Sequence, residues 1–141
     1  MSLLGIFDIS GSAMNAESMR LNVTASNLAN ADSVAPSAQA AYRSRHPVFA
    51  TQLREFSANP ELDEPGVGVR VLDVIQSQAA PAKRYQPDHP LADATGYVYG
   101  SNVNTVEELT NMISASRSFQ GNVEVMTTAR ELVLKTLTLG H

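Results

Sequence analysis

Large apolar residues recur at the spacing of an α-helix in one segment near each end of the chain. Between residues 4 and 28 they alternate at steps of three and four, which predicts a helix with a single apolar stripe. The stripe consists of Leu4, Phe7, Gly11, Met14, Ser18, Leu21, Ala25 and Leu28. Large and small members alternate, so a partner helix can approach closely. Pro36 disfavours helical backbone in the residue before it, and we expect the helix to end between residues 30 and 34.

A second periodic segment follows Asn104 and continues almost to the C-terminus. Thr105 and Glu108 predict a capping box, in which the Thr105 hydroxyl accepts from an early backbone N–H and Glu108 reaches back. The stripe that follows consists of Leu109, Met112, Ser116, Phe119, Val123, Met126, Arg130, Val133 and Leu137. A helix of about 33 residues is about 50 Å long, so it needs a partner of similar length.

The middle of the chain is β-like and rich in loops. Residues 66–74 alternate valines on one face, which predicts a strand, and residues 95–100 predict a short second strand that forms a hairpin with it. Residues 81–90 contain three prolines and are interpreted as a turn-rich connection. Residues 35–62 carry no strong pattern and are expected to form an extended or partly ordered loop.

These elements predict a mainly α fold with a small β part. The two long terminal helices pair antiparallel as a coiled coil and form one helical domain, from residues 1–34 and 105–141, with residues 35–104 as a loop and β-hairpin insertion between them. Apolar residues also flank the two stripes, namely Ile9, Val23, Ile113 and Leu134. They either cover the middle region of the same chain or contact other chains.

Composition excludes several functional classes. The 141 residues include no Cys, which excludes a disulfide scaffold, a zinc finger, an iron–sulfur cluster and cysteine-based catalysis. A net charge of -4 with 10 Lys and Arg argues against a chain that neutralises nucleic-acid or lipid phosphates. We expect no membrane span and no cleaved secretory signal, since no long apolar run and no basic N-terminal region are present.

The sequence offers no convincing catalytic or metal site. Residues 88–90, Asp-His-Pro, are interpreted as a turn, and His46 as a solvated or stacking residue between two arginines. Nucleotide-binding, hydrolase and metalloprotease motifs are absent from the sequence. We therefore expect no enzyme activity, no cofactor and no metal. Arg130 occupies a stripe position where an apolar residue is expected, so it either snorkels or pairs with an acid on a partner helix.

Specific sequence motifs give more information about the family of the protein than the periodicity does. Residues 26–31, Ser-Asn-Leu-Ala-Asn-Ala, end the first helix, are followed by Tyr42-Arg43, and resemble the signature of the flagellar rod and hook family. Residues 6–13, 102–104 and 114–122 resemble the proximal rod proteins within that family. The family motif falls on Ser26, Asn27, Leu28, Ala29 and Asn30. By this resemblance the motif turns the chain out of the helix, where Asn tolerates left-handed backbone and bonds to nearby backbone.

The resemblance implies a structural subunit of the bacterial flagellar basal body, polymerised helically into the proximal rod in the periplasm. Such a subunit forms part of the drive shaft and the axial export channel, and it leaves the cell through the flagellar type III export apparatus without a cleaved signal. The implied partners are copies of itself, other rod proteins, the rod–MS-ring adaptor and ring proteins, with no nucleic acid and no small-molecule substrate.

The assembly seam would then use large stripe residues of both helices, with Arg130 in an ion pair between helices. The seam residues are Phe7, Met14, Leu21, Leu109, Met112, Phe119, Val123, Met126, Val133 and Leu137. The alternative hypothesis is a helical-hairpin adaptor that binds a partner helix without forming a filament. An adaptor predicts that residues 35–104 cover Ile9, Val23, Ile113 and Leu134, and a filament predicts that these residues are buried between subunits.

Overall fold

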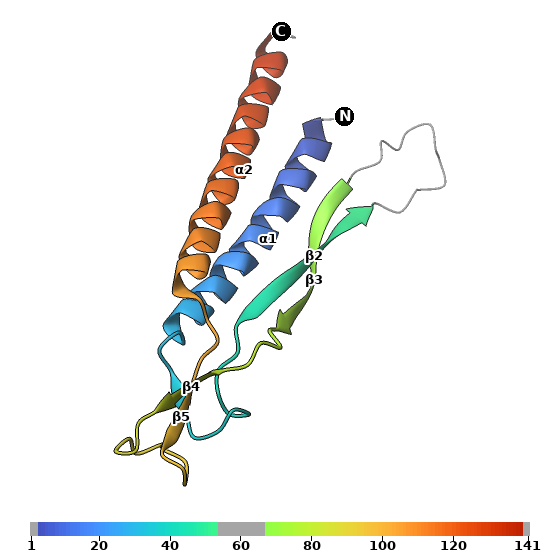
Figure 1. Cartoon of the computed structure of the whole chain (residues 1–141). Coiled ribbons are helices and arrows are strands. Elements are labelled where there is room, and N and C mark those ends of the chain that lie inside the picture. Colours follow the sequence, from blue (N-terminus) through green and yellow to red (C-terminus); the bar gives the residue numbers. More distant parts are fainter. Residues whose placement is uncertain (1–2, 54–66, 140–141) are drawn as a thin grey trace. The chain divides into compact units, whose positions relative to one another are not determined.

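The structure, a computed structural model, describes residues 3–53 and 67–139. Its described elements are two long terminal helices and five short strands between them (Figure 1). In chain order they are α1 Leu3–Ala29, β1 Val34–Ala35, β2 Arg45–Leu53, β3 Val67–Gln76, β4 Ala82–Tyr85, β5 Tyr97–Gly100 and α2 Thr105–Leu139. The prediction of a mainly α fold with two long terminal helices and a small β part is confirmed.

The helices α1 and α2 contact each other and run in opposite directions (Figure 1). Phe7 and Met14 of α1 line the same groove as Val123 and Met126 of α2. Further along α1, the Arg20 guanidinium donates to the Asn111 side-chain carbonyl at 3.3 Å. The α1 residues with higher numbers therefore contact α2 residues with lower numbers, as an antiparallel pair requires.

The chain divides into two compact units, and each contains part of both helices. The first unit comprises the described residues of Met1–Met19, Val48–Asp73 and Ser114–His141. The second comprises Arg20–Pro47 and Val74–Ile113. The predicted division at residues 34 and 104, into a helical domain and an insertion, stays a prediction.

In the first unit, β3 approaches α1 closely at Gly68. The Ser12 hydroxyl accepts from the Val69 N–H at 3.1 Å and donates to the Ile9 carbonyl at 2.8 Å. A Cβ atom at Gly68 would lie 3.0 Å from the Ser12 hydroxyl oxygen. Glycine at this position therefore permits the contact between strand and helix.

The second unit contains an antiparallel sheet in the order β1-β5-β4. Val98 of β5 is fully buried, whereas all four residues of β4 are exposed. The hairpin predicted from residues 66–74 and 95–100 is wrong, because β3 pairs with β2 and β5 pairs with β1 and β4. Three strands were not predicted. The strand β1 has only two residues, and β2 and β4 lie in segments interpreted from the sequence as loop or turn, since neither shows a clear alternation of apolar and polar residues.

The connection from β4 to β5 is held by the Asp93 carboxylate. One carboxylate oxygen accepts from the Thr95 hydroxyl at 2.7 Å, the Thr95 N–H at 2.8 Å and the Tyr97 N–H at 3.0 Å. These hydrogen bonds, led by that from the Thr95 hydroxyl, lower the pKa of Asp93 to about 2. The carboxylate therefore remains charged, and the turn keeps these bonds, until the pH falls well below the ordinary pKa of 3.8.

The N-terminal cap of α2 lies one residue earlier than predicted. The Asn104 side-chain oxygen accepts from the Val106 N–H at 3.1 Å and the Glu107 N–H at 3.4 Å. Asn104 thus takes the capping role expected of Thr105, because Asn and Thr are both good caps and the sequence places them side by side. Glu108, expected to reach back to the cap, is buried with 3% of its surface exposed.

Two glycines should respond in opposite ways to replacement by alanine. Gly96 has a φ of 77°, and a Cβ there would lie 2.9 Å from Tyr85 Cε2. Gly96→Ala should lower the opening free energy of β4 and β5 by about 1–2 kcal/mol, measured by amide hydrogen exchange. Gly121 in α2 has open space around it. Gly121→Ala should stabilise the helix by up to about 1 kcal/mol, measured as a change in the free energy of unfolding by thermal melting followed with circular dichroism. Destabilisation by both substitutions would contradict this assignment.

Candidate functional site

The motif at the end of α1 is built around a buried asparagine. Asn27 has no exposed surface. Its side-chain N–H donates to the Arg45 carbonyl at 2.8 Å, and its side-chain oxygen accepts from the Arg45 N–H at 2.9 Å. These two bonds are the pair that a neighbouring strand would make with the same residue. Asn27 therefore fixes the first residue of β2 to the last turn of α1.

Tyr42 completes this arrangement, which we call the Asn27 clamp and define as Asn27, Tyr42 and Arg45. The Tyr42 hydroxyl donates to the Asn27 side-chain oxygen at 3.0 Å and lies 3.3 Å from the Ser26 hydroxyl. The Arg45 guanidinium carbon lies 5.7 Å from the centre of the Tyr42 ring. The clamp thus gives both polar atoms of the buried amide a hydrogen-bond partner, as a buried polar site requires.

The other motif residues end the helix. The Asn30 side-chain N–H donates to the Ser26 carbonyl at 2.8 Å, which satisfies one carbonyl of the last turn. Leu28 is half-buried and Ala29 is exposed. The expected left-handed backbone does not occur, because Gly96 is the one described residue with a positive φ. The motif asparagines therefore act through their side-chain amides and not through unusual backbone angles.

A second asparagine, Asn102, joins two other segments of the same unit. The Asn102 side-chain oxygen accepts from the Ser44 N–H at 2.7 Å, and its N–H group donates to the Ala79 carbonyl at 2.9 Å. The Ser44 carbonyl in turn accepts from the Ser77 N–H at 2.8 Å. Residues 102–104 were among those carrying the family resemblance, but the sequence alone gave no indication of this role, because its partners are backbone groups.

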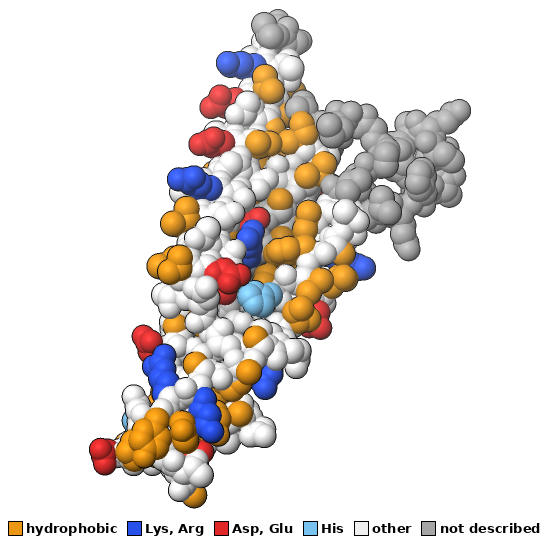
Figure 2. Space-filling model, viewed as in Figure 1, with side chains coloured by type: hydrophobic (Ala, Val, Ile, Leu, Met, Phe, Trp, Pro, Cys, Tyr) orange, Lys and Arg blue, Asp and Glu red, His pale blue; other side chains and the backbone are white. Residues whose placement is uncertain are grey.

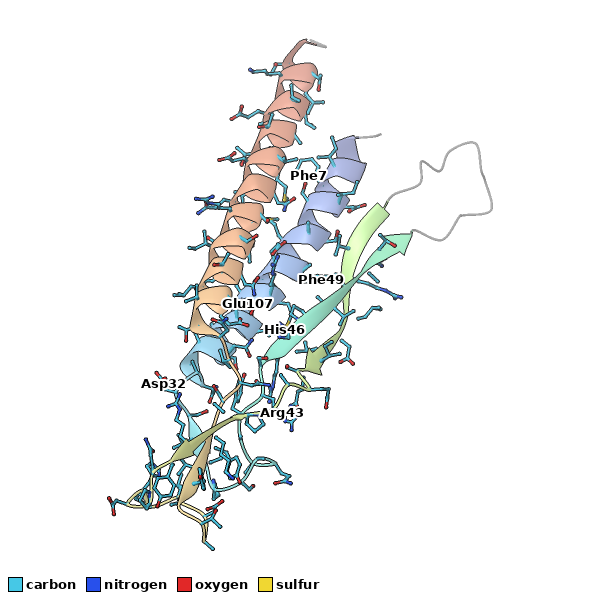
Figure 3. All side chains as sticks on the ribbon, in the orientation of Figure 1. Phe7, Asp32, Arg43, His46, Phe49 and Glu107 are labelled. Carbon is cyan, nitrogen blue, oxygen red and sulfur yellow. The ribbon has the colours of Figure 1, made fainter. Side chains whose placement is uncertain are left out.

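An open groove of about 340 Å³ lies in the first unit, between side chains of α1 and α2. Its lining is Phe7 (Figure 3), Met14, Val123, Met126, Thr127 and Arg130. All but the last two are apolar. Arg130 is exposed, and the described residues include no acid paired with its guanidinium. The groove therefore combines an apolar floor with one available cation.

The seam residues of α2 fall on two sides. Met112, Phe119, Met126 and Val133 are half-buried, whereas Leu109, Val123 and Leu137 are 47%, 42% and 63% exposed. The fully buried line beside the half-buried one consists instead of Glu108, Ala115 and Ala129. On α1 the seam residues Phe7, Met14 and Leu21 are half-buried. Contact of the exposed residues with other subunits stays a prediction.

Large apolar side chains remain exposed along α2. Figure 2 shows apolar side chains on the surface of the molecule. Ile113 is 56% exposed and Leu134 is 51% exposed, whereas Ile9 and Val23 of α1 are half-buried. The exposed large apolar residues of α2 are Val106, Leu109, Ile113, Val123, Val125, Leu132, Leu134 and Leu137.

The two histidines in the described part of the chain have local roles. The His89 ring accepts from the Leu91 N–H at 3.1 Å within the turn after β4. The His46 ring nitrogen (Figure 3) lies 3.3 Å from the Ser44 hydroxyl. Within residues 3–53 and 67–139, no three His, Cys, Asp or Glu side chains form a group that could hold a metal ion. Neither described helix combines the length and apolar character of a membrane span.

Known protein families match both ends of the chain. The family described as "Flagella basal body rod protein" matches residues 7–43, and the one described as "Flagellar basal body rod FlgEFG protein C-terminal" matches residues 94–139. Flagellar basal-body rod proteins FlgC from Escherichia coli O6:H1, Salmonella typhimurium and Yersinia enterocolitica are 52%, 51% and 53% identical to the chain, over the full length of each. The chain belongs to the FlgC family of flagellar basal-body rod proteins.

Membership of the FlgC family confirms the resemblance to flagellar rod proteins and the prediction of a structural, non-enzymatic subunit of the basal-body rod. The N-terminal match includes Asn27 and Tyr42 and ends just before Arg45. Sequence comparison therefore locates two members of the Asn27 clamp. It does not reveal the third, which contributes its main-chain N–H and carbonyl.

Removing the Asn27 side chain should loosen the link between α1 and β2. Asn27→Ala leaves the Arg45 N–H, the Arg45 carbonyl and the Tyr42 hydroxyl without their partner, so we expect a loss of about 2–4 kcal/mol in the free energy of unfolding. Tyr42→Phe should lose about 1 kcal/mol. Asn22→Ala, at an exposed position of the same helix, is the control and should stay within about 0.5 kcal/mol. Urea unfolding of the three variants measures these values, and equal values for Asn27 and Asn22 would refute the clamp.

Proposed function

We propose that the chain polymerises helically into the proximal rod in the periplasm, where it forms part of the drive shaft and the axial export channel. The observation that carries this proposal is the set of large apolar side chains exposed along α2. Contiguous exposed apolar surface marks an interaction site in a soluble protein. A rod subunit buries such side chains against its neighbours.

The energy available from this surface is large enough for assembly. Fully burying one Leu, Ile or Val side chain contributes about 1.5–3 kcal/mol. Burying even a few of the exposed residues of α2 on each subunit therefore offsets a substantial part of the free energy lost on association. Contacts between different faces of identical subunits do not close into a pair, and they generate helical filaments.

The proposed partners are copies of this chain, other rod proteins, the rod–MS-ring adaptor and ring proteins, with the flagellar type III export apparatus in transit. Family membership supports assembly with rod components. The absence of Cys from the sequence suits passage through a narrow channel as an unfolded chain, because no disulfide can cross-link it on the way.

The adaptor hypothesis fits the structure less well. It requires residues 35–104 to cover the apolar residues that flank the two stripes. Ile113 and Leu134 are both more than half exposed, although Ile9 and Val23 are half-buried. The two exposed residues are therefore available to other subunits, as a filament requires.

Charged substitutions on the exposed face of α2 should prevent assembly without unfolding the subunit. Ile113→Asp and Leu134→Asp would place a carboxylate at the proposed contact, so incorporation into basal bodies should fall at least about tenfold. Thr128→Asp, at an exposed polar position of the same helix, is the matched control. Incorporation and swimming are measured in a flagellated strain that lacks its own copy. Normal incorporation of both test variants would overturn the proposal.

Arg130 should contribute to assembly through its charge. We expect it to pair with a carboxylate of a neighbouring helix at the mouth of the groove, which is desolvated on assembly. Arg130→Leu should swim more slowly than the parent, Arg130→Glu more slowly still, and Arg130→Lys at an intermediate rate, all read as swarm diameter. If the Leu variant swam as well as the parent, the ion pair would be ruled out.

A further inference from the structure

The groove of the first unit has a defined length along both helices. Its lining residues Phe7 and Met14 on α1 are seven residues apart, as are Val123 and Arg130 on α2. Seven residues of α-helix span two turns, or about 10.5 Å. Because the helices are antiparallel, Met14 and Val123 lie at one end of the groove, and Phe7 and Arg130 lie at the other.

A ridge of the same length lies on the opposite side of α2. Val125 and Leu132, which we call the α2 ridge, are 47% and 50% exposed and are also seven residues apart. Each follows a residue that lines the groove, Val123 or Arg130, by two positions, which is a rotation of about 200° around the helix axis. One copy therefore carries the groove on one side of α2 and the ridge on the other.

The charges at the groove and beside the ridge complement each other. Arg130 is exposed at one end of the groove, and the described residues include no acid paired with its guanidinium. Along one side, the ridge is bordered by three exposed residues at helical spacings of four and three, Glu124, Thr128 and Glu131. Lys135 continues this side beyond the two turns that the groove spans. An acidic border of this kind favours contact with a cationic groove.

We propose that the groove of one copy holds the α2 ridge of a second copy, with Arg130 of the first paired to Glu131 of the second. The inference rests on the proposed function, which brings copies together, and it names the contact between them. Groove and ridge are different surfaces of the subunit, so the contact leaves a free groove on one copy and a free ridge on the other. Contacts of this type continue from copy to copy and generate helical filaments when the rotation does not close.

The direction of the helices selects Glu131 over Glu124 as the partner of Arg130. Copies in a helical filament point the same way along its axis, so the two α2 helices run parallel. Leu132 of the second copy then lies at the end of the groove that Arg130 occupies, and Val125 lies at the other end. Glu131 adjoins Leu132 and is therefore the acid nearer to the guanidinium. The two helices are displaced by two residues, or about 3 Å, along their axes.

Substitutions at Thr128 should depend on the sign of the charge. Thr128 shares a side of the helix with Glu124 and Glu131, from which it is four and three residues away. Thr128→Asp adds a carboxylate to the border that faces Arg130, so this variant should enter basal bodies as the parent does. Thr128→Arg places a cation in the same position, and its incorporation should fall about tenfold because like charges then meet.

Cross-linking tests the contact directly, because the sequence contains no Cys. Val125→Cys and Val123→Cys would be placed on separately tagged copies, co-expressed in a flagellated strain that lacks its own copy, and treated with a short bismaleimide in isolated basal bodies. Packed helices have axes about 8–10 Å apart, so the reagent spans the contact and we expect a mixed dimer. Val125→Cys with Val106→Cys, an exposed position about 25 Å away along α2 in this register, is the control and should give none.

Charge reversal adds a second readout with a restoring variant. Glu131→Arg brings two cations together at one end of the groove, so incorporation into basal bodies should fall about tenfold. Adding Arg130→Glu to the same chain recreates the pair with its charges exchanged and should restore most of the incorporation. Glu107→Arg, at an exposed acidic position of the same helix, is the matched control and should be incorporated as the parent is.

The outcomes separate this inference from the proposed function. If both cysteine variants are incorporated but no mixed dimer forms, or if the control pair cross-links equally well, the contact between groove and ridge is overturned and the rod function stands. Normal incorporation of Glu131→Arg, or no restoration by Arg130→Glu, also overturns it. Should a cysteine variant fail to incorporate, the charge series at positions 128, 130 and 131 decides the question. Failure of the parent chain itself to enter basal bodies would instead overturn the proposed function.

Discussion

The buried side chains of α1 and α2 are small or polar, and much of the rest of the structure follows from this constraint. The buried positions of the two helices include Ser10, Ala16, Ala115 and Ala129. Small side chains let two helix backbones approach closely, but they bury little apolar surface. Most of the large apolar residues of α2 are exposed. The fold thus leaves them available to neighbouring subunits of the basal-body rod.

Hydrogen bonds of buried or partly buried side chains, and not apolar burial, hold the chain where it leaves the helices. Asn27 is fully buried and bonds to both main-chain groups of Arg45, and Asn102 joins the segments at Ser44 and Ala79. Each amide supplies a donor and an acceptor, so one side chain can hold a strand as another strand would. The second unit is therefore held together by a few specific bonds in place of an extensive apolar core.

The sequence predicted the elements in which large apolar side chains recur at a regular spacing. It did not predict the elements that lack such a pattern. Both helices followed from periodicity, but β4, Ala82–Tyr85, is exposed on both faces and has no alternation to detect. Of the seven α2 seam residues, Leu109, Val123 and Leu137 are exposed, whereas Ala115 and Ala129, which carry little hydrophobic weight in the sequence, are buried. The family motif located Asn27, whereas the role of Arg45 depends on main-chain groups that every residue except proline possesses.

The Asn27 clamp has a consequence for variation at its third member. Because Asn27 recognises only the main-chain N–H and carbonyl of residue 45, substitutions there leave both bonds intact unless proline is introduced. The Arg45 side chain is exposed and adds one ring contact with Tyr42. Position 45 is consequently a place where evolution can alter the surface charge, or an experimenter can attach a fluorophore, without removing the hydrogen bonds that join β2 to α1.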